Sequence, residues 1–293
     1  MIKNGKMTLL IHIVLSLFTI LAVLPFILMF MSSITNESMI FQNGYSFIPD
    51  KLSADAYRYV LVNLGQIGRA YGVTVFITVS GTAVNLLITA MLAYSLSRPF
   101  LPCRSFFNLL VVLTLLFNGG LVPTYLVYTQ IFHIKNTVWA LLLPNLLMSP
   151  FHVILAKTYF INSIPSEIMD AATIDGAGEI RIFFRLVLPL AKPMMVTIGL
   201  FSGIAYWNDW MNSLYYITNV RLIGIQSYLN RILSDLQYLQ SNEAAASMSG
   251  DISFPGMSIR MAIATMAILP IVILFTIFQK HFVRGIAMGA LKG

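Results

Sequence analysis

Residues 164–177 read IPSEIMDAATIDGA, and residues 188–193 read LPLAKP. The first stretch and all but the last residue of the second belong to a polar, charged loop, 158–192, that lies between two long apolar runs. Groups of this polarity are costly to place in hydrocarbon, so the loop belongs in water while the runs beside it do not. The alternation indicates a chain that crosses a membrane and has one conspicuous water-exposed loop.

The composition indicates the same class of protein. Hydrophobic residues make up 58% of the chain and charged residues only 10%, and the mean hydropathy is +0.81. A soluble domain of this size needs more charge on its surface. Several apolar runs reach the roughly 20 residues that cross about 30 Å of hydrocarbon. We therefore predict an all-α polytopic membrane protein, a single transmembrane domain over 1–293, with six spans at about 8–31, 71–97, 105–129, 137–157, 193–217 and 260–279.

The placement of Lys and Arg predicts the orientation. With the N-terminus in the cytoplasm, eleven of the 18 Lys and Arg residues fall on the cytoplasmic side, where the loops are shorter, and seven fall outside. Both termini and the loop 158–192 are then cytoplasmic, and the segments 32–70 and 218–259 lie outside. The net charge of +7 is spread singly over the ends of the spans rather than gathered into a patch, so we expect no nucleic-acid partner.

The loop 158–192 predicts a short helix. Ser163 or Ser166 can cap its N-terminus, with Pro165 in the first turn, where its missing N–H costs nothing. Gly176 is placed to end the helix in a left-handed turn. One face follows the helical spacing and is small and flat, made by Ile164, Ile168, Ala171, Ala172 and Asp175. Physics alone leaves two interpretations open: a connecting helix that lies on the membrane surface, or a docking helix for a partner.

The loop resembles the cytoplasmic EAA loop of ABC-importer permeases. The residues in register with that pattern are Ile164, Pro165, Glu167, Ala171, Ala172, Ile174, Asp175, Gly176, Ala177, Phe183, Leu188, Pro189, Leu190 and Pro193. Asp170 departs from it by replacing the first Glu of the triplet with a shorter acid.

Other segments extend the resemblance over nearly the whole chain. Residues 278–285 and 288–293 are similar to the C-terminus of sugar-importer permeases of the maltose-transporter type. Residues 117–125 and 207–210 are similar to the branch that imports oligosaccharides from complex polysaccharides, including LplC-like, aldouronate and alginate permeases.

The resemblance implies a permease of the bacterial inner membrane that works in an assembly. A second homologous permease forms a heterodimer with it, two cytoplasmic ATPase subunits bind ATP and Mg, and an extracytoplasmic solute-binding protein delivers an oligosaccharide. This chain then has no catalytic, cofactor or metal site, and its sequence contains no GxxxxGK[ST] phosphate loop. The implied coupling residues are Glu167, Asp170, Ala171, Ala172, Asp175 and Gly176, and the tail residues Lys292 and Gly293 are candidate ATPase contacts.

Polar residues within the spans are candidates for a substrate path. Asp209 is ionisable and flanked by aromatic side chains that could stack on pyranose rings, but hydration or anchoring at the outer interface explains it equally well. Asn118 belongs either to a binding feature or to a kink in the third span, and the kink is favoured. The candidates are Tyr206, Trp207, Asn208, Asp209, Trp210 and Asn118. We interpret Asn85 and His152 as packing partners across helices, and Gly199 with Gly203 as a close-packing pair.

Two other functions compete with the importer. An ion-coupled secondary sugar transporter usually needs acids or histidines deep in the membrane, and the spans contain His152 and His12 but no deep Asp or Glu. A membrane enzyme needs a paired acid and base, a metal triad or an activated nucleophile, and no such motif is present. The polysaccharide branch implies an oligosaccharide, with an acidic uronate of the alginate type as the narrower expectation, although almost no basic residue lies within the spans.

Overall fold

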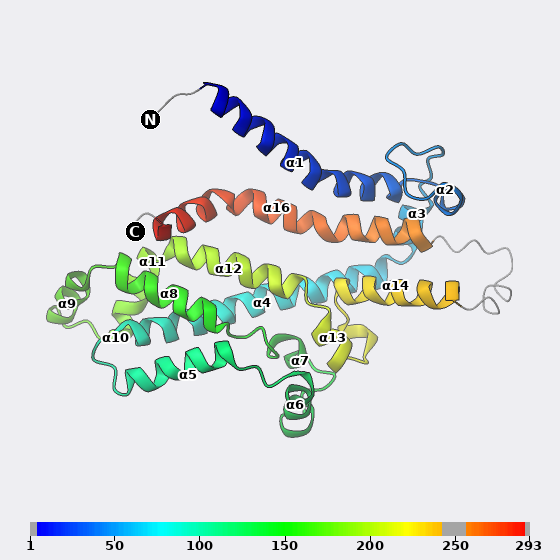
Figure 1. Cartoon of the computed structure of the whole chain (residues 1–293). Helices are drawn as coiled ribbons and strands as arrows, with labels where there is room; N and C mark the ends of the chain where they lie inside the picture. Colours follow the sequence, from blue (N-terminus) through cyan, green and yellow to red (C-terminus); the bar gives the residue numbers. More distant parts are fainter. Residues whose placement is uncertain (1–4, 242–255, 291–293) are drawn as a thin grey trace. The chain divides into compact units, whose positions relative to one another are not determined.

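The computed structural model describes the backbone of residues 5–241 and 256–290, and the described residues are predominantly helical (Figure 1). The chain divides into two compact units. One comprises Met1–Gly68 and Tyr228–Pro270, and the other comprises Arg69–Ser227 and Ile271–Gly293. The predicted single transmembrane domain stays a prediction. An isolated β-bridge joins Thr35 to Leu52 in the first unit.

The first unit begins with α1 (Gly5–Ser33), whose apolar side chains are exposed along nearly its whole length. It agrees with the predicted span at 8–31. Two short helices follow, α2 (Glu37–Asn43) and α3 (Asp55–Val62). Among the described residues of its unit, the side chains of α1 are largely uncovered until its last turn, and a helix that is hydrophobic all round is suited to lipid or to a partner subunit.

A buried carboxylate joins α2 to the start of α16 (Gly256–Ala290). Glu37 is 8% exposed, and its two oxygens accept hydrogen bonds from the backbone N–H of Met257 at 2.7 Å and of Ser258 at 2.8 Å. The hydroxyl of Ser258 donates a third bond at 2.6 Å. The first N–H groups of a helix have no partner inside it, and its N-terminus carries partial positive charge, so Glu37 caps α16.

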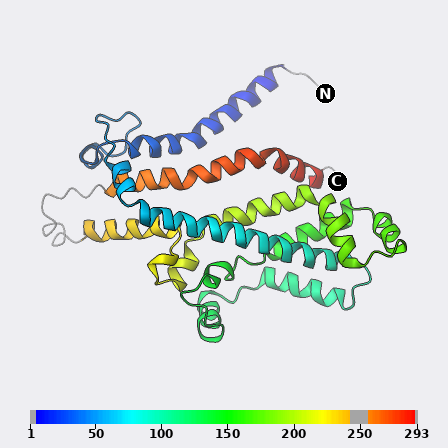
Figure 2. The ribbon, with the colours of Figure 1, turned by 180° about the vertical axis from the view of Figure 1, so that it is seen from behind.

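The second unit contains most of α4 (Leu64–Ser97), together with α5 (Arg104–Leu116), α8 (Pro150–Ser163) and α12 (Lys192–Trp207). Their buried side chains form one apolar cluster that includes Ala93, Val153, Phe160 and Ile198. In Figure 2, which shows the chain from behind, α4 is the long cyan helix. The cluster also takes in the chain on both sides of the polar loop, so the loop rests on a packed base.

Close packing of α4 on α12 depends on glycine. A Cβ added to Gly199 would lie 3.2 Å from Leu86, and one added to Gly203 would lie 3.5 Å from Thr82. On the α4 side, a Cβ at Gly81 would lie only 2.5 Å from the ring of Tyr206. The predicted role of Gly199 and Gly203 in close helix packing is therefore confirmed.

Among the described residues, three helices are long and apolar enough to cross a membrane: Met7–Ser33, Leu64–Ser97 and Gly256–Ile273. Two further pairs of helices are each bent at a short break, and they raise the number of candidate spans to five if each pair is counted as one span. Arg104–Leu116 and Leu121–Ile131 meet at 114°, and Glu179–Leu190 and Lys192–Trp207 meet at 82°. The second helix starts earlier than the predicted span at 71–97.

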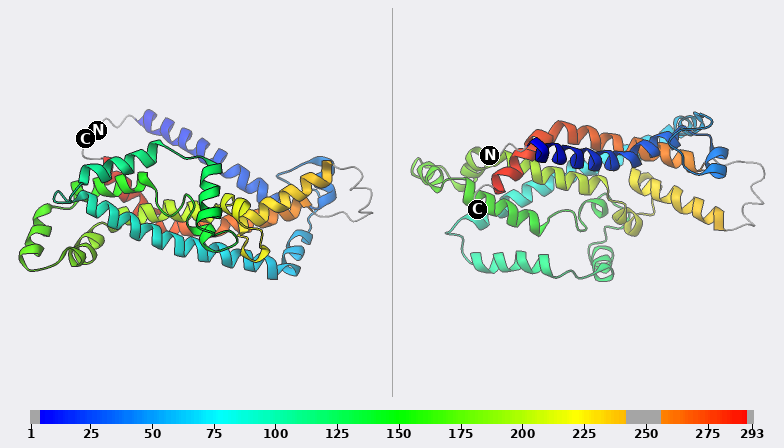
Figure 3. Two further views of the ribbon diagram at one scale, coloured as in Figure 1. Left: turned by 90° about the horizontal axis from the view of Figure 1, so that it is seen from below. Right: turned by 45° about the horizontal axis from the view of Figure 1, so that its top comes forward.

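The predicted third span, 105–129, is broken rather than kinked. After α5 the backbone leaves the helix at Phe117, and Gly120 adopts a φ of 82°. The side chain of Asn118 accepts a hydrogen bond from the Gly120 N–H at 2.8 Å, which favours a turn over a continuing helix. The chain resumes as α6 (Leu121–Leu126) and a π-helical turn at Val127–Ile131, steeply inclined to α5 (Figure 3).

The predicted fourth span, 137–157, is helical mainly in its second half. A single turn, α7 (Trp139–Leu142), is followed by non-helical backbone up to Pro150, where α8 begins. Pro144 and the left-handed Asn145, with a φ of 61°, interrupt the helix. Three side chains donate to the freed carbonyls: Tyr206 to Leu142 at 2.9 Å, Asn212 to Pro144 at 3.0 Å, and Asn85 to Leu146 at 2.8 Å.

The predicted fifth span, 193–217, contains a break as well. α12 ends at Trp207, and a short helix, α13 (Met211–Tyr216), follows after three residues. A further helix, α14 (Ile225–Ser241), lies in the segment predicted to be outside the membrane. The sequence predicted an interruption of the third span at Asn118, but it did not predict the breaks in the fourth and fifth spans.

Candidate functional site

The polar loop forms a helix, α9 (Ser166–Ile174), at one end of the second unit (Figure 1). Pro165 is the residue that precedes it, with extended backbone at ψ 132°, and no side chain caps the N-terminus. The predicted cap by Ser163 or Ser166 is therefore wrong, because proline itself fixes the entry of the chain. Ile164, 4% exposed, anchors that entry in the apolar cluster.

Gly176 ends α9 as predicted. Its φ is 80°, in the left-handed region that non-glycine residues avoid. Its N–H donates to the Thr173 carbonyl at 3.0 Å, and the N–H of Ala177 donates to the Ala172 carbonyl at 2.9 Å. This pair of bonds is a complete Schellman motif, which gives the chain a sharp and reproducible exit from the helix.

α9 turns one side inward and leaves the rest exposed. Met169 and Ala172 pack against the apolar cluster. The predicted flat face is thus divided, because Ile164 and Ala172 point into the unit rather than toward a partner. The exposed positions combine acids with apolar groups, and they are Glu167, Ile168, Asp170, Ala171, Ile174 and Asp175. Ile174 is 87% exposed and therefore free to make apolar contact with a partner.

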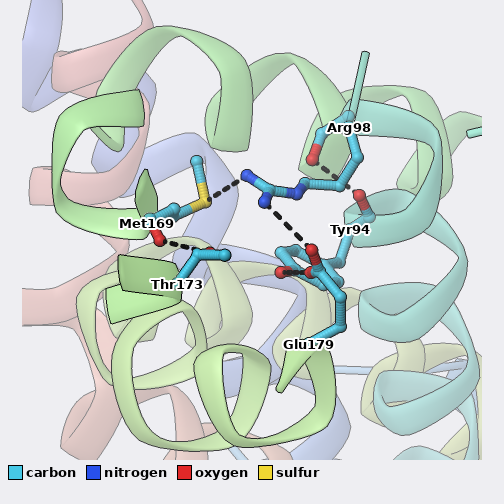
Figure 4. Close-up of polar contacts among 6 residues, drawn as sticks. Tyr94, Arg98, Met169, Thr173 and Glu179 are labelled. Atoms are coloured by element: carbon cyan, nitrogen blue, oxygen red, sulfur yellow. Dashed lines mark hydrogen bonds and ion pairs between the residues drawn. The ribbon is translucent and has the colours of Figure 1, made fainter. Parts of the chain in front are cut away.

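A polar cluster ties the loop to the end of α4 (Figure 4). Arg98, which follows α4, donates to Glu179 at 3.0 Å and to the sulfur of Met169 at 3.3 Å. The Tyr94 hydroxyl donates to the other oxygen of Glu179. The Arg98 guanidinium also lies 5.8 Å from the centre of the Tyr94 ring. One arginine therefore contacts both α9 and the first residue of α10 (Glu179–Ile182).

The charge on Glu179 is stabilised by these partners. Burial on its own raises the pKa of the carboxyl group, but the hydrogen bonds from Tyr94 and Arg98, with the positive charge of Arg98, outweigh it and leave the pKa below its ordinary value. The ion pair is consequently intact throughout the neutral pH range.

Sequence reasoning missed this cluster. None of Tyr94, Arg98 and Glu179 is among the candidate residues predicted above. Tyr94 and Arg98 are four residues apart at the end of a helix, a spacing that places them on one side. Nothing in the sequence, however, indicates that a glutamate more than eighty positions later meets them.

Tyr206 and Trp207, two candidates for the substrate path, are buried within the chain. Tyr206 is 3% exposed, packs on Gly81 and donates to the Leu142 carbonyl. Trp207 is 4% exposed, and its ring lies 6.4 Å from that of Tyr71. In this structure both side chains hold helices together.

The other candidates lie at breaks in the helices. Asn208 is exposed and ends α12, and Asp209 accepts a hydrogen bond from the Asn212 N–H at 3.2 Å at the start of α13. Trp210 is 38% exposed, and its carbonyl accepts from the Ser227 hydroxyl at 3.2 Å. Asn118 is exposed and forms the turn at Gly120. Each has a local structural role, and the structure does not bring Asn118 together with the group at 206–210 in one site.

Lys292 and Gly293, the predicted tail contacts, lie outside the described residues. Within the described part of the chain, no group of three or more His, Cys, Asp or Glu side chains could hold a metal ion.

The sequence pattern that defines one family, the binding-protein-dependent transport system inner membrane component, matches residues 84–288. That match includes the loop, α9 and most of the second unit. This chain belongs to that family. Members of the family are the transmembrane permeases of ABC importers, in which separate subunits hydrolyse ATP. The fold class predicted from the sequence, a helical ABC-importer permease, is confirmed.

The permease is similar to several sugar-import proteins. It is 35% identical to the polygalacturonan/rhamnogalacturonan transport system permease protein YtcP of Bacillus subtilis, over 99% of this chain and 100% of the relative. It is also 35% identical to protein LplC of the same organism, over 93% and 90% of the two chains. A crystal structure of a bacterial ABC transporter involved in the import of the acidic polysaccharide alginate superposes with a TM-score of 0.82 at 27% identity, over 96% of this chain and 99% of that chain.

Proposed function

We propose that this permease is one of two transmembrane subunits of an ATP-driven importer for oligosaccharides, and that α9 is the helix on which the ATPase acts. The observation that supports the coupling role most directly is the form of α9. Pro165 fixes the backbone where α9 begins, and Gly176 ends the helix in a left-handed turn. Arg98 contacts α9 through Met169, and the remaining faces of the helix are exposed. A helix that only lies on a membrane needs none of these constraints.

The exposed surface of α9 suits a protein groove. The carboxylates of Glu167, Asp170 and Asp175 can pair with basic or amide groups on the ATPase, and Ile168 and Ile174 supply apolar contact. Ala171 keeps the surface low enough for close approach. Ala172 and Gly176 act from behind, by seating the helix on the apolar cluster and by defining its end.

A movement of α9 would be transmitted to the membrane helix α4 through Arg98. Because this arginine contacts Met169 and Glu179 and directly follows α4, a shift of the loop pulls on the longest helix of the second unit. Tyr94, 7% exposed and hydrogen-bonded to Glu179, gives the same connection a second attachment one turn earlier.

The family implies the rest of the assembly. We propose a second homologous permease, two cytoplasmic ATPase subunits that hold ATP and Mg, and an extracytoplasmic solute-binding protein. The chain lies in the bacterial inner membrane with both termini in the cytoplasm, where Lys292 and Gly293 can reach the ATPases. The substrate is an oligosaccharide from a complex polysaccharide, with uronate oligomers as the first class to test because of what YtcP and the alginate importer are named for.

The choice of energy source separates this function from ion-coupled sugar transport. We expect uptake of labelled galacturonate oligomers to stop when ATP is depleted and to survive a protonophore while ATP is held constant. Loss of uptake with the protonophore alone would favour the ion-coupled transporter.

Substitutions in α9 test the coupling role. Gly176→Pro imposes a φ near −65° where the structure has 80°, and it removes the N–H that bonds to Thr173. Ala172→Arg places a long charged side chain against the apolar cluster. Both variants should insert normally and retain ATPase activity in the complex but lose uptake. Gly178→Ala is the matched control, since its φ is negative and a Cβ there meets nothing within 4 Å. Normal transport by the Pro and Arg variants would refute the role.

A further inference from the structure

A polar recess lies in the second unit, at the level of the breaks in the helices. It has a volume of about 400 Å³ and is lined by α4, α12 and the non-helical segment that precedes α8. Among its lining residues are Asn85, Asn145, Ser149, His152, Phe201 and Ser202. These residues fall within the predicted spans 71–97, 137–157 and 193–217, so the predicted topology places the recess at membrane depth.

Part of this polar set only supports the wall. Asn85 is 2% exposed, donates to the Leu146 carbonyl at 2.8 Å and accepts from the Ser202 hydroxyl at 2.8 Å. Its amide is therefore occupied by the protein itself. Together with the bonds from Tyr206 and Asn212, this contact fixes the position of the unwound segment.

Other polar groups at the recess are not used in this way. Asn145 is exposed and held in a left-handed conformation, and Ser149 makes no cap hydrogen bond to α8 although it stands at the N-cap position. The Nδ1 atom of His152 is buried and has no hydrogen-bond partner among the described residues. Such groups are too costly to face hydrocarbon, and unwound backbone at membrane depth is tolerated where it lines a water-filled cavity or is buried in protein.

Aromatic surface lies beside these polar groups. The His152 ring is stacked on Phe201 with centroids 6.0 Å apart and an interplanar angle of 22°. Phe201 is 41% exposed and Phe151, which also lines the recess, is 55% exposed. A pyranose presents an apolar C–H face and a rim of hydroxyls, so it needs an aromatic surface next to hydrogen-bonding side chains. Among the described lining residues there is no Lys, Arg, Asp or Glu.

We propose that this recess binds one pyranose ring of the transported oligosaccharide, with its hydroxyls on Asn145, Ser149 and His152 and its C–H face on Phe201. The inference rests on the proposed function and assigns this chain a direct contact with its substrate. Because no ionised side chain lines the recess, it recognises ring and hydroxyl groups and not a sugar carboxylate. Selection for acidic sugars then belongs to another component of the importer.

Cysteine labelling tests the recess without requiring transport. In a Cys103→Ser background of the complete complex, Ser149→Cys should react with a membrane-impermeant thiol reagent, and digalacturonate or the neutral galactobiose should slow that reaction about three- to tenfold. Thr158→Cys, in the C-terminal half of α8 and outside the recess, should not be protected from labelling by either sugar. Absence of labelling at position 149 in all nucleotide states would overturn the proposal. Protection by digalacturonate alone would overturn recognition of the uncharged ring.

Transport kinetics provide the second measurement. His152→Phe keeps the ring and removes its nitrogens, Ser149→Ala removes the hydroxyl, and Asn145→Gly removes the amide while tolerating the left-handed backbone. Each should raise the half-saturating sugar concentration for uptake about three- to tenfold. Thr158→Val is the control. Unchanged half-saturation in all three recess variants would overturn the proposal but leave the importer function intact, whereas absence of ATP-driven uptake in the wild-type complex would refute the importer function itself.

Discussion

At the scale of single residues, the structure brings side chains that are far apart in the sequence into one polar cluster. Glu179 begins a short helix after α9, and Arg98 follows the long helix α4. The side chain of Arg98 is 13% exposed, whereas the side chain of Glu179 is 60% exposed. A pair so open on one side contributes little to stability, and we infer that its value lies in the geometry that it imposes.

A double-mutant cycle measures that geometry. Arg98→Gln and Glu179→Gln should each reduce sugar uptake roughly two- to fivefold, and the double variant should be no worse than either single one, because all three break the same contact. Uptake and ATPase rates in the reconstituted complex provide the measurement, with Lys192→Gln, an exposed cation on the same loop, as the control. Additive losses would show that the two residues act independently.

The same pair has a predictable pH dependence. The pKa of Glu179 is lowered in the folded chain, so its contribution to stability is fully present above the ordinary pKa of 4.5 and is lost as the pH falls through the lower folded value. We expect the difference in thermal stability between the wild type and Glu179→Gln to be constant from pH 6 to 8 and to shrink in more acidic buffer. A difference that grows on acidification would contradict the assignment.

Gly81 tests the packing role of Tyr206. A Cβ at this position would lie 2.5 Å from the ring, so Gly81→Ala should destabilise the chain by about 1–3 kcal/mol. Gly72→Ala on the same helix meets nothing within 4 Å and should be neutral or stabilising. Thermal unfolding in detergent distinguishes the two. Equal stability of both variants would indicate that Tyr206 is free to leave α4 and to face a substrate.

At the scale of elements, helix ends determine how this chain is organised. The start of α16 is held by Glu37 of α2, the end of α9 by Gly176, and the unwound segment before α8 by side chains of α4, α12 and α13. Helix ends carry unsatisfied backbone groups, and inside a membrane those groups must find partners within the protein. Interrupted helices therefore appear where other elements supply donors and acceptors.

The cap on α16 can be tested by removing its charge. Glu37→Gln keeps the size of the side chain but loses a charged acceptor at a helix N-terminus, so we expect a loss of about 1–3 kcal/mol in stability. Asp50→Asn, an exposed acid in the same unit, is the control and should change stability little. A Glu37 variant as stable as the control would show that the buried carboxylate is dispensable.

At the scale of the whole molecule, the proposed topology assigns α9 and the segment 32–70 to opposite sides of the membrane. The assignment follows from the bias of Lys and Arg toward the short loops and from the apolar helices that separate the two segments. The broken helices do not prevent it, because a bent pair can cross the bilayer as one span when its break is buried in protein.

A matched pair of isoleucines tests the topology. Ile174 is 87% exposed on α9 and Ile48 is 80% exposed between α2 and α3, so both tolerate Cys in a Cys103→Ser background. An impermeant reagent should label Ile48→Cys in right-side-out vesicles and Ile174→Cys in inverted ones. Labelling of both from the same side would refute the orientation, and cross-linking of Ile174→Cys to a copurifying ATPase would support the docking of α9.

Composition, apolar runs and the loop motif were enough to predict the class, the family and the helix that Gly176 ends. These properties are local: hydropathy acts on each segment separately, and a left-handed turn needs only its glycine. The turn at Asn118 is local as well, because its own side chain accepts the Gly120 N–H. The break at Asn145 depends instead on side chains from other helices that satisfy the freed backbone. For the same reason the contact of Arg98 with Glu179 and the recess beside His152 appear only in the folded chain, where segments distant in sequence share one environment.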